Sequence, residues 1–229
     1  MGRLHQQAML NIFIGYDPRV PMAYNVLQHS IVRHASKPVA ITPLILSQLP
    51  IKRRGLTEFT YSRFLVPYLC GYEGVGIFMD SDIVVTGDIY EMLPALNLNA
   101  VSVMKNQPEF EWASVMLFVC GACRNLTPEF IDDEQNRLFD MAWAKSVGSI
   151  ADEWNHCVGY QQPKDAKLYH FTQGLPHWPE TQGLQEDAAW HEEHQEAMKS
   201  VGWYELMGKS VHAPLVLKRM LGRYGVKIK

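Results

Sequence analysis

Short apolar runs alternate along the chain with stretches in which apolar residues recur at helical spacing. The first run, residues 10–16, is almost continuously apolar, as expected of a strand buried on both faces. Asp17 and Pro18 end this run, and Pro21 suits the first turn of a helix that should extend to about Ala35. The same pattern predicts five more main strands and one short one, at residues 39–46, 74–79, 83–85, 100–104, 114–119 and 167–172.

Further helical segments are predicted, among them a turn and short helix at residues 87–93. Residues 56–69 have apolar positions at helical spacing, Thr127 and Pro128 suit the start of a helix reaching about Ala144, and residues 180–199 are polar and partly helical. The alternation favours an α/β fold in which helices flank a mostly parallel central sheet. We predict a single domain over residues 1–202, followed by a basic tail at residues 203–229. Ligands of such sheets bind at the carboxyl ends of the strands.

Composition and charge narrow the class of protein. With 229 residues, 47% of them apolar and 20% charged, the chain can bury the core of one compact domain. The net charge of −3 disfavours a nucleic-acid partner, because phosphate binding needs an excess of basic residues. We expect no membrane-spanning helix and no signal peptide, since the apolar stretches are short. Four cysteines are too few for a disulfide framework, so we expect a protein of the reducing cytoplasm.

Asp80 and Asp82 directly follow the strand predicted at residues 74–79. Residues two apart in an extended backbone point to the same side, so these carboxylates repel each other unless a cation lies between them. Mg²⁺ or Mn²⁺ would satisfy both carboxylates and keep positions free for phosphate oxygens. Two alternatives stay open at this point. The pair could be a solvated turn, or it could belong to a haloacid-dehalogenase-type phosphatase with Asp80 as nucleophile and Asp82 as acid or base.

Further motifs accompany the acidic pair, in a fixed order along the chain. They lie at residues 12–17 (IFIGYD), 60–64 (TYSRF), 78–82 (FMDSD), 153–155 (EWN) and 170–178 (HFTQGLPHW). Together they resemble the nucleotide-sugar glycosyltransferases of the GT-A type, especially family eight, which includes glycogenin and bacterial lipopolysaccharide glycosyltransferases. The resemblance covers about residues 11–178 and implies a GT-A, Rossmann-like domain. In the rival phosphatases the acidic pair usually lies near the start of the chain, and nothing in them predicts the last motif.

The resemblance implies a nucleotide-sugar donor, UDP-linked in our prediction, and a divalent metal ion. Asp80 and Asp82 match the metal motif of the family, and His170 matches a further ligand. An imidazole beside carboxylates suits Mn²⁺ better than Mg²⁺. Family members often carry a Lys before the final Pro-Trp, but this chain has His177 there, so Lys164 or Lys167 is an alternative diphosphate contact. The residues expected to contact the nucleotide or its diphosphate are Tyr16, Asp17, Arg63, Asp80, Ser81, Gly174 and His177.

Family-eight enzymes retain the configuration of the transferred sugar, and the resemblance implies the same here. In a front-face mechanism the leaving phosphate accepts the proton of the acceptor, so the enzyme works mainly by positioning and electrostatics. A nearby carboxylate or carboxamide would stabilise the oxocarbenium-like sugar. The candidates for this role are Asp140, Glu153 and Asn155. For Asp140 the favoured alternative is a carboxylate on a helix surface.

The predicted tail has six basic residues against one acidic residue, with apolar residues between them. Such a segment can lie on an anionic membrane surface, and it can equally be a solvated helix. We therefore expect transfer of a hexose to a saccharide or lipid-linked acceptor, in the cytoplasm or on the inner face of the membrane. The remaining alternative is a catalytically silent nucleotide-sugar-binding protein on the same scaffold.

Overall fold

A six-stranded sheet forms the centre of the computed structural model, which describes residues 9–97, 99–105, 109–162, 164–181, 183 and 186–201. The strand order is β2-β1-β3-β6-β5-β7. β1 is parallel to β2 and β3, and β5 is parallel to β7, whereas β6 is antiparallel to β3 and β5. This confirms the predicted α/β fold with a mostly parallel sheet, although β7 was not predicted. The strands are β1 (Leu10–Gly15), β2 (Val39–Leu44), β3 (Val75–Met79), β5 (Val101–Val103), β6 (Val115–Val119) and β7 (Val147–Ser149).

A second sheet of three strands has the order β4-β9-β8. It consists of β4 (Ile83–Val85), β8 (Trp154–Cys157) and β9 (Leu168–His170). β4 and β9 pair antiparallel, with Ile83 opposite His170. β8 was not predicted, because its residues (WNHC) do not form an apolar run, unlike those of the shorter β4 (IVV). This small sheet brings His170 beside the chain that leaves β3.

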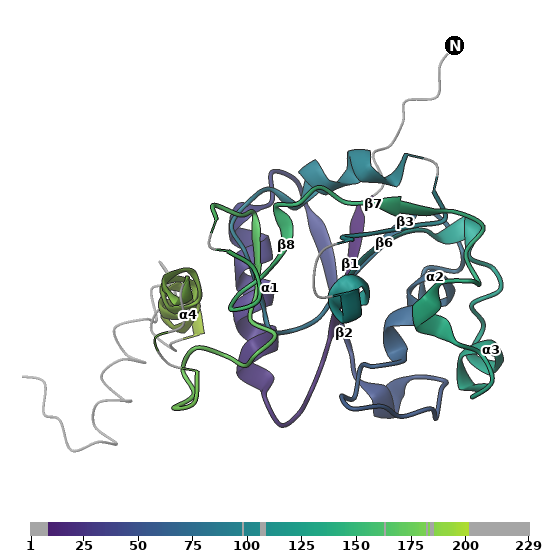
Figure 1. Ribbon diagram of the computed structural model, residues 1–229, viewed down its shortest axis with the longest axis horizontal. Coiled ribbons are helices and arrows are strands. Elements are labelled where there is room, and N and C mark those ends of the chain that lie inside the picture. The colour runs from purple at the N-terminus through teal and green to yellow at the C-terminus, as the bar shows by residue number, and fades with distance from the viewer. Residues whose placement is uncertain are drawn as a thin grey trace, which may run out of the picture.

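Helices lie on both sides of the central sheet, with α1 (Pro21–His34) and α4 (Asp187–Val201) opposite α2 (Val66–Leu69) and α3 (Pro128–Asp132) (Figure 1). Alternating residues of the strands face the two sides. Ile12, Ile14 and Ile77 pack in one cluster with Leu27 of α1. Phe13 and Phe78 pack on the other side with Val66 of α2 and Ile131 of α3. The nearly continuous apolar runs of β1 and β3 follow from this burial on two faces.

Two predicted helices are much shorter than expected. Residues 56–69 form turns, a 3₁₀ segment and only the short α2, where Pro67 lacks a backbone N–H. Thr127 caps the start of α3 as predicted, since its hydroxyl accepts a hydrogen bond from the N–H of Phe130, but the helix ends at Asp132. There the guanidinium of Arg53 donates to the backbone carbonyls of Ile131, Asp133 and Asn136, at 3.2, 2.9 and 3.1 Å. Arg53, which is distant in the sequence, therefore supplies hydrogen-bond donors where a further helical turn would have supplied backbone N–H groups.

The remaining helical segments are 3₁₀ turns, at Leu46–Gln48, Ser62–Leu65, Ile89–Leu96, Glu109–Ser114, Cys120–Ala122 and Leu138–Asp140. Within the described residues no helix combines the length and the apolar character needed to span a membrane. The predicted basic tail, residues 203–229, lies outside the described residues.

Candidate active site

The carboxyl end of β3 places Asp80 and Asp82 at the edge between the two sheets. The N–H of Asp80 donates to the carbonyl of Ser114 at 2.9 Å, which continues the pairing of β3 with β6. The N–H of Phe171 donates to the carbonyl of Asp82 at 2.8 Å. His170 therefore lies next to Asp82, and its Nε2 is 3.3 Å from Asp82 Oδ1. The structure thus brings together the three residues predicted as metal ligands.

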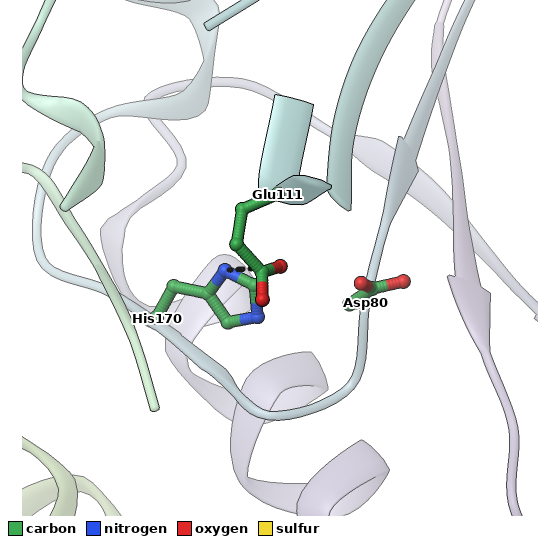
Figure 2. Close-up of side chains that lie close together, drawn as sticks. All are labelled: Asp80, Glu111 and His170. Atoms are coloured by element: carbon green, nitrogen blue, oxygen red, sulfur yellow. Dashed lines mark ion pairs between the residues drawn. The ribbon is translucent and has the colours of Figure 1, made fainter. Parts of the chain in front are cut away.

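Glu111 joins this cluster from the 3₁₀ segment that precedes β6, and it was not predicted. Asp80, Glu111 and His170 are all buried, and each offers a ligand atom within 4.8 Å of the others (Figure 2). Glu111 Oε2 lies 3.7 Å from His170 Nδ1, and the hydroxyl of Thr172 donates to Glu111 Oε1. No motif marks Glu111 in the sequence. Its place depends on the antiparallel pairing of β6 with β3, which the sequence pattern does not specify.

Arg63 is buried behind the acidic residues. Its Nη2 lies 3.0 Å from Asp80 Oδ1, its Nη1 donates to the carbonyl of Ala113 at 2.7 Å, and its Nε donates to the carbonyl of Thr60 at 3.1 Å. Only 7% of the residue is exposed. The sequence suggested a contact with nucleotide or diphosphate, whereas the structure shows the guanidinium paired with Asp80. Such a pair needs partners on every donor, because a buried charge without partners is strongly unfavourable.

Asn155 holds the imidazole of His170 in place. Its Oδ1 accepts a hydrogen bond from His170 Nδ1 at 3.1 Å, and its Nδ2 donates to Ser114 Oγ at 2.9 Å and to the carbonyl of Glu111 at 3.2 Å. A carboxamide oxygen only accepts, so Nδ1 carries the proton and Nε2 faces Asp82. Asn155 was predicted as a catalytic candidate. Its contacts make it a residue that orients His170.

Charge and burial make the cluster suited to a cation. Burial raises the pKa of Asp80 to about 7, although the charge of Arg63 opposes this effect. Burial alone would lower the pKa of His170, but Asp82 and Glu111 raise it well above its ordinary value. Asp80 Oδ1 and Asp82 Oδ1 are buried and accept no hydrogen bond from the described residues, so their contacts are the ion pairs with Arg63 and His170. Carboxylates and an imidazole around buried oxygens fit a divalent ion such as Mn²⁺.

A pocket of about 370 Å³ opens beside Asp82. Asp17, Ser81 and Gly174, all predicted to contact the nucleotide, line this pocket. Gly174 has a φ of +124°, and a Cβ there would lie 2.9 Å from the ring of Trp178, so only glycine fits. Arg19 also lines the pocket and donates hydrogen bonds to Asp17, which holds the pKa of Asp17 below its ordinary value.

Other predicted residues lie apart from the acidic cluster. Asp140 is exposed, and its Oδ2 lies 3.6 Å from Arg137 Nε. Glu153 pairs with Lys167, with 3.4 Å between Glu153 Oε1 and Lys167 Nζ. The structure brings neither carboxylate to the cluster.

Two residues with aromatic rings that were predicted to contact the nucleotide or its diphosphate, His177 and Tyr16, pack against other aromatic rings. The ring of His177 stacks on Trp190 of α4 at 5.2 Å between centroids. The ring of Tyr16 packs edge-on against the ring of Tyr24, with 5.6 Å between the ring centroids. Lys164, the alternative diphosphate contact, donates from Nζ to the carbonyl of Asp152. None of these three side chains is among the residues that line the pocket beside Asp82.

Solved glycosyltransferases share this architecture. GlyE of Streptococcus pneumoniae TIGR4 matches with a TM-score of 0.64 and 15% identity, over 95% of this chain and 64% of that one. The bifunctional glycosyltransferase WbbM matches with a TM-score of 0.63 and 15% identity, over 96% of this chain and 53% of that one. The galactosyltransferase LgtC, solved with donor and acceptor sugar analogs, matches with a TM-score of 0.53 and 11% identity, over 81% and 95% of the two chains.

The chain therefore has the GT-A fold, and its acidic pair after β3 lies in a glycosyltransferase scaffold rather than in that of the rival phosphatase. It spans 53% and 64% of the lengths of WbbM and GlyE. No protein-family model matches the sequence. Protein CDI of Arabidopsis thaliana is 33% identical, in a match covering 72% of this chain and 78% of that protein. The chain belongs to the same family as Protein CDI.

Proposed function

We propose that the protein is a metal-dependent glycosyltransferase that moves a hexose from a nucleotide-sugar, UDP-linked in our proposal, to a saccharide or lipid-linked acceptor with retention. The observation that carries this proposal is the meeting of Asp80, Asp82 and His170 beside a pocket of about 370 Å³ in a GT-A fold. A fold alone does not establish an activity, so the argument depends on the chemistry of this site.

Asp80, Asp82 and His170 would hold the divalent ion. When bound, the ion would neutralise the negative charge that grows on the diphosphate as the glycosidic bond breaks. Asn155 keeps His170 Nε2 turned toward Asp82, and Arg63 fixes the carboxylate of Asp80. Such partners of metal ligands tune both geometry and affinity.

The diphosphate would lie in the pocket beside Asp82. Arg19 is the one cationic side chain among the described residues that line this pocket. Its guanidinium can exchange its partner Asp17 for a phosphate group, because both are recognised by the same planar set of donors. Gly174 also lines this pocket, and the ring of Trp178 fills the place that a side chain at position 174 would take. We propose Arg19 as the cation that replaces the Lys expected in the last motif.

Residues 203–229 lie outside the described part of the chain. We propose that this basic segment is distinct from the catalytic domain and contacts an anionic membrane surface. A lipid-linked acceptor would be presented at such a surface. Removal of residues 203–229 should then weaken sedimentation with anionic vesicles and leave nucleotide binding unchanged.

Nucleotide binding tests the proposed function directly. UDP with Mn²⁺ should raise the thermal unfolding temperature, because a ligand of the folded state stabilises it by mass action. UDP with EDTA should not. Asp82→Asn should abolish the Mn²⁺-dependent shift, whereas Asp140→Asn, a matched change outside the cluster, should keep it. Slow hydrolysis of a UDP-hexose would separate an enzyme from a silent binding protein.

Two results would overturn the proposal. One is the absence of any Mn²⁺-dependent shift with UDP, GDP or CMP. The other is hydrolysis of a generic phosphomonoester that depends on Asp80, which would favour the phosphatase alternative.

A further inference from the structure

Glu111 is a buried carboxylate for which the glycosyltransferase motifs give no role. It is 7% exposed, and it reaches the cluster from a segment that contains neither the Asp-x-Asp pair nor His170. Its two oxygens face Thr172 and His170. A carboxylate in such a place needs compensation, because a buried charge without a partner is strongly unfavourable.

The distances suit coordination of one ion. Ligand atoms of Asp80, Glu111 and His170 all lie within 4.8 Å of one another. Two oxygens on opposite sides of an ion with bonds of about 2.1 Å are about 4.2 Å apart. Small rotations of these side chains would therefore place all three around one cation. Figure 2 shows the carboxylate of Glu111 next to the imidazole of His170, with Asp80 across from the two side chains.

The net charge of the cluster also favours a bound divalent ion. Asp80, Asp82 and Glu111 are three carboxylates, and Arg63 is the one guanidinium that contacts them in the described structure, through Asp80. As a ligand of a metal ion His170 would have to be neutral, and two of the three negative charges would then be without compensation. One divalent ion would balance them. The sole basic side chain paired with Glu111 among the described residues is His170.

We propose that Glu111 is a further ligand of the divalent ion, beside Asp80, Asp82 and His170. This inference rests on the metal site of the proposed function. With three carboxylates and an imidazole from the chain, the ion binds before the nucleotide arrives. The protein therefore holds Mn²⁺ without the help of diphosphate oxygens.

Mn²⁺ binding to the nucleotide-free protein, followed by electron paramagnetic resonance, tests this inference. The wild-type chain should bind Mn²⁺ without UDP, and Glu111→Gln should lower the affinity roughly tenfold or more. Glu153→Gln, a carboxylate away from the cluster, should have no effect. Circular dichroism shows whether the variants fold. If Glu111→Gln does not fold, Glu111→Asp replaces it, and it should also bind Mn²⁺ more weakly, since its shorter side chain withdraws the oxygen.

A second comparison separates a ligand from a residue that only positions His170. In a His170→Ala background, Glu111→Gln should weaken Mn²⁺ binding further. If the double variant binds Mn²⁺ as tightly as His170→Ala alone, the inference is overturned, because Glu111 would then act through His170. Equal Mn²⁺ affinity of the wild-type protein and Glu111→Gln would also overturn it, while Mn²⁺-dependent UDP binding would leave the proposed function standing. Absence of Mn²⁺ binding even with UDP would overturn both.

Discussion

Replacement of Arg63 by methionine tests the electrostatic organisation of the site. Methionine keeps an unbranched apolar chain but removes the charge and the donors to Asp80, Ala113 and Thr60. Loss of one partner of a buried ion pair costs about 3–5 kcal/mol. The two carbonyls that lose their donors contribute to this cost, since each unsatisfied buried group costs about 1–3 kcal/mol. We expect Arg63→Met to lower the free energy of unfolding by about 3–5 kcal/mol.

Urea unfolding followed by circular dichroism measures this change. Arg54→Met is the matched control, because Arg54 pairs with Glu58 at 3.3 Å but its side chain is 69% exposed. Exposed pairs contribute about 0.2–1 kcal/mol, so the control should lose no more than that. The double variant of Arg63→Met with Asp80→Asn should lose less than the sum of the single losses, by about 1–3 kcal/mol. Additive losses, or equal losses for Arg63→Met and Arg54→Met, would refute the reasoning.

Three further predictions concern the pocket and its surroundings. Arg19→Ala should weaken binding of UDP with Mn²⁺ but not of uridine, measured by calorimetry, and equal losses for both would exclude a diphosphate contact. Gly15→Ala should cost about 1–3 kcal/mol in urea unfolding, because the new Cβ would lie 2.3 Å from the ring of Phe59; an unchanged midpoint would contradict this packing. Burial lowers the pKa of His177 in the folded protein. As the pH drops, His177 therefore binds a proton in the unfolded chain at a higher pH than in the folded one. The free energy of unfolding should consequently fall below about pH 6.5. His177→Gln should reduce this slope in unfolding curves measured across the pH range, and an unchanged slope would assign it to other groups.

Local patterns predicted much of the fold. β1, α1 and β3 lie where the apolar runs and Pro21 place them, because burial on two faces and a proline in the first turn leave direct traces in the sequence. The lengths of the helices were less predictable. α3 stops at Asp132, where Arg53, from a distant segment, donates hydrogen bonds to the carbonyl of Ile131 and to two carbonyls beyond the helix. Helical spacing cannot reveal a partner that lies far away in the chain.

The candidate site shows the same division. Asp80 and Asp82 were found from their place after a buried strand, and His170 from a motif resemblance. Glu111 was missed because its position depends on how β6 pairs with β3. Asp140 was a candidate for stabilising the reacting sugar, with a carboxylate on the surface as the favoured alternative, and it lies exposed beside Arg137. A single acidic residue in a sequence does not show whether its carboxylate will face the site or the solvent.

The amino-acid sequence determined the α/β class, the main strands and the acidic pair at a strand end, since apolar periodicity and turn residues act over a few neighbouring positions. Only the tertiary structure decided which charges meet. Pairing of β4 with β9 places His170 beside Asp82, and pairing of β3 with β6 places Glu111 near Asp80. These contacts join segments far apart in the chain, and they depend on the balance of burial and charge across the whole fold.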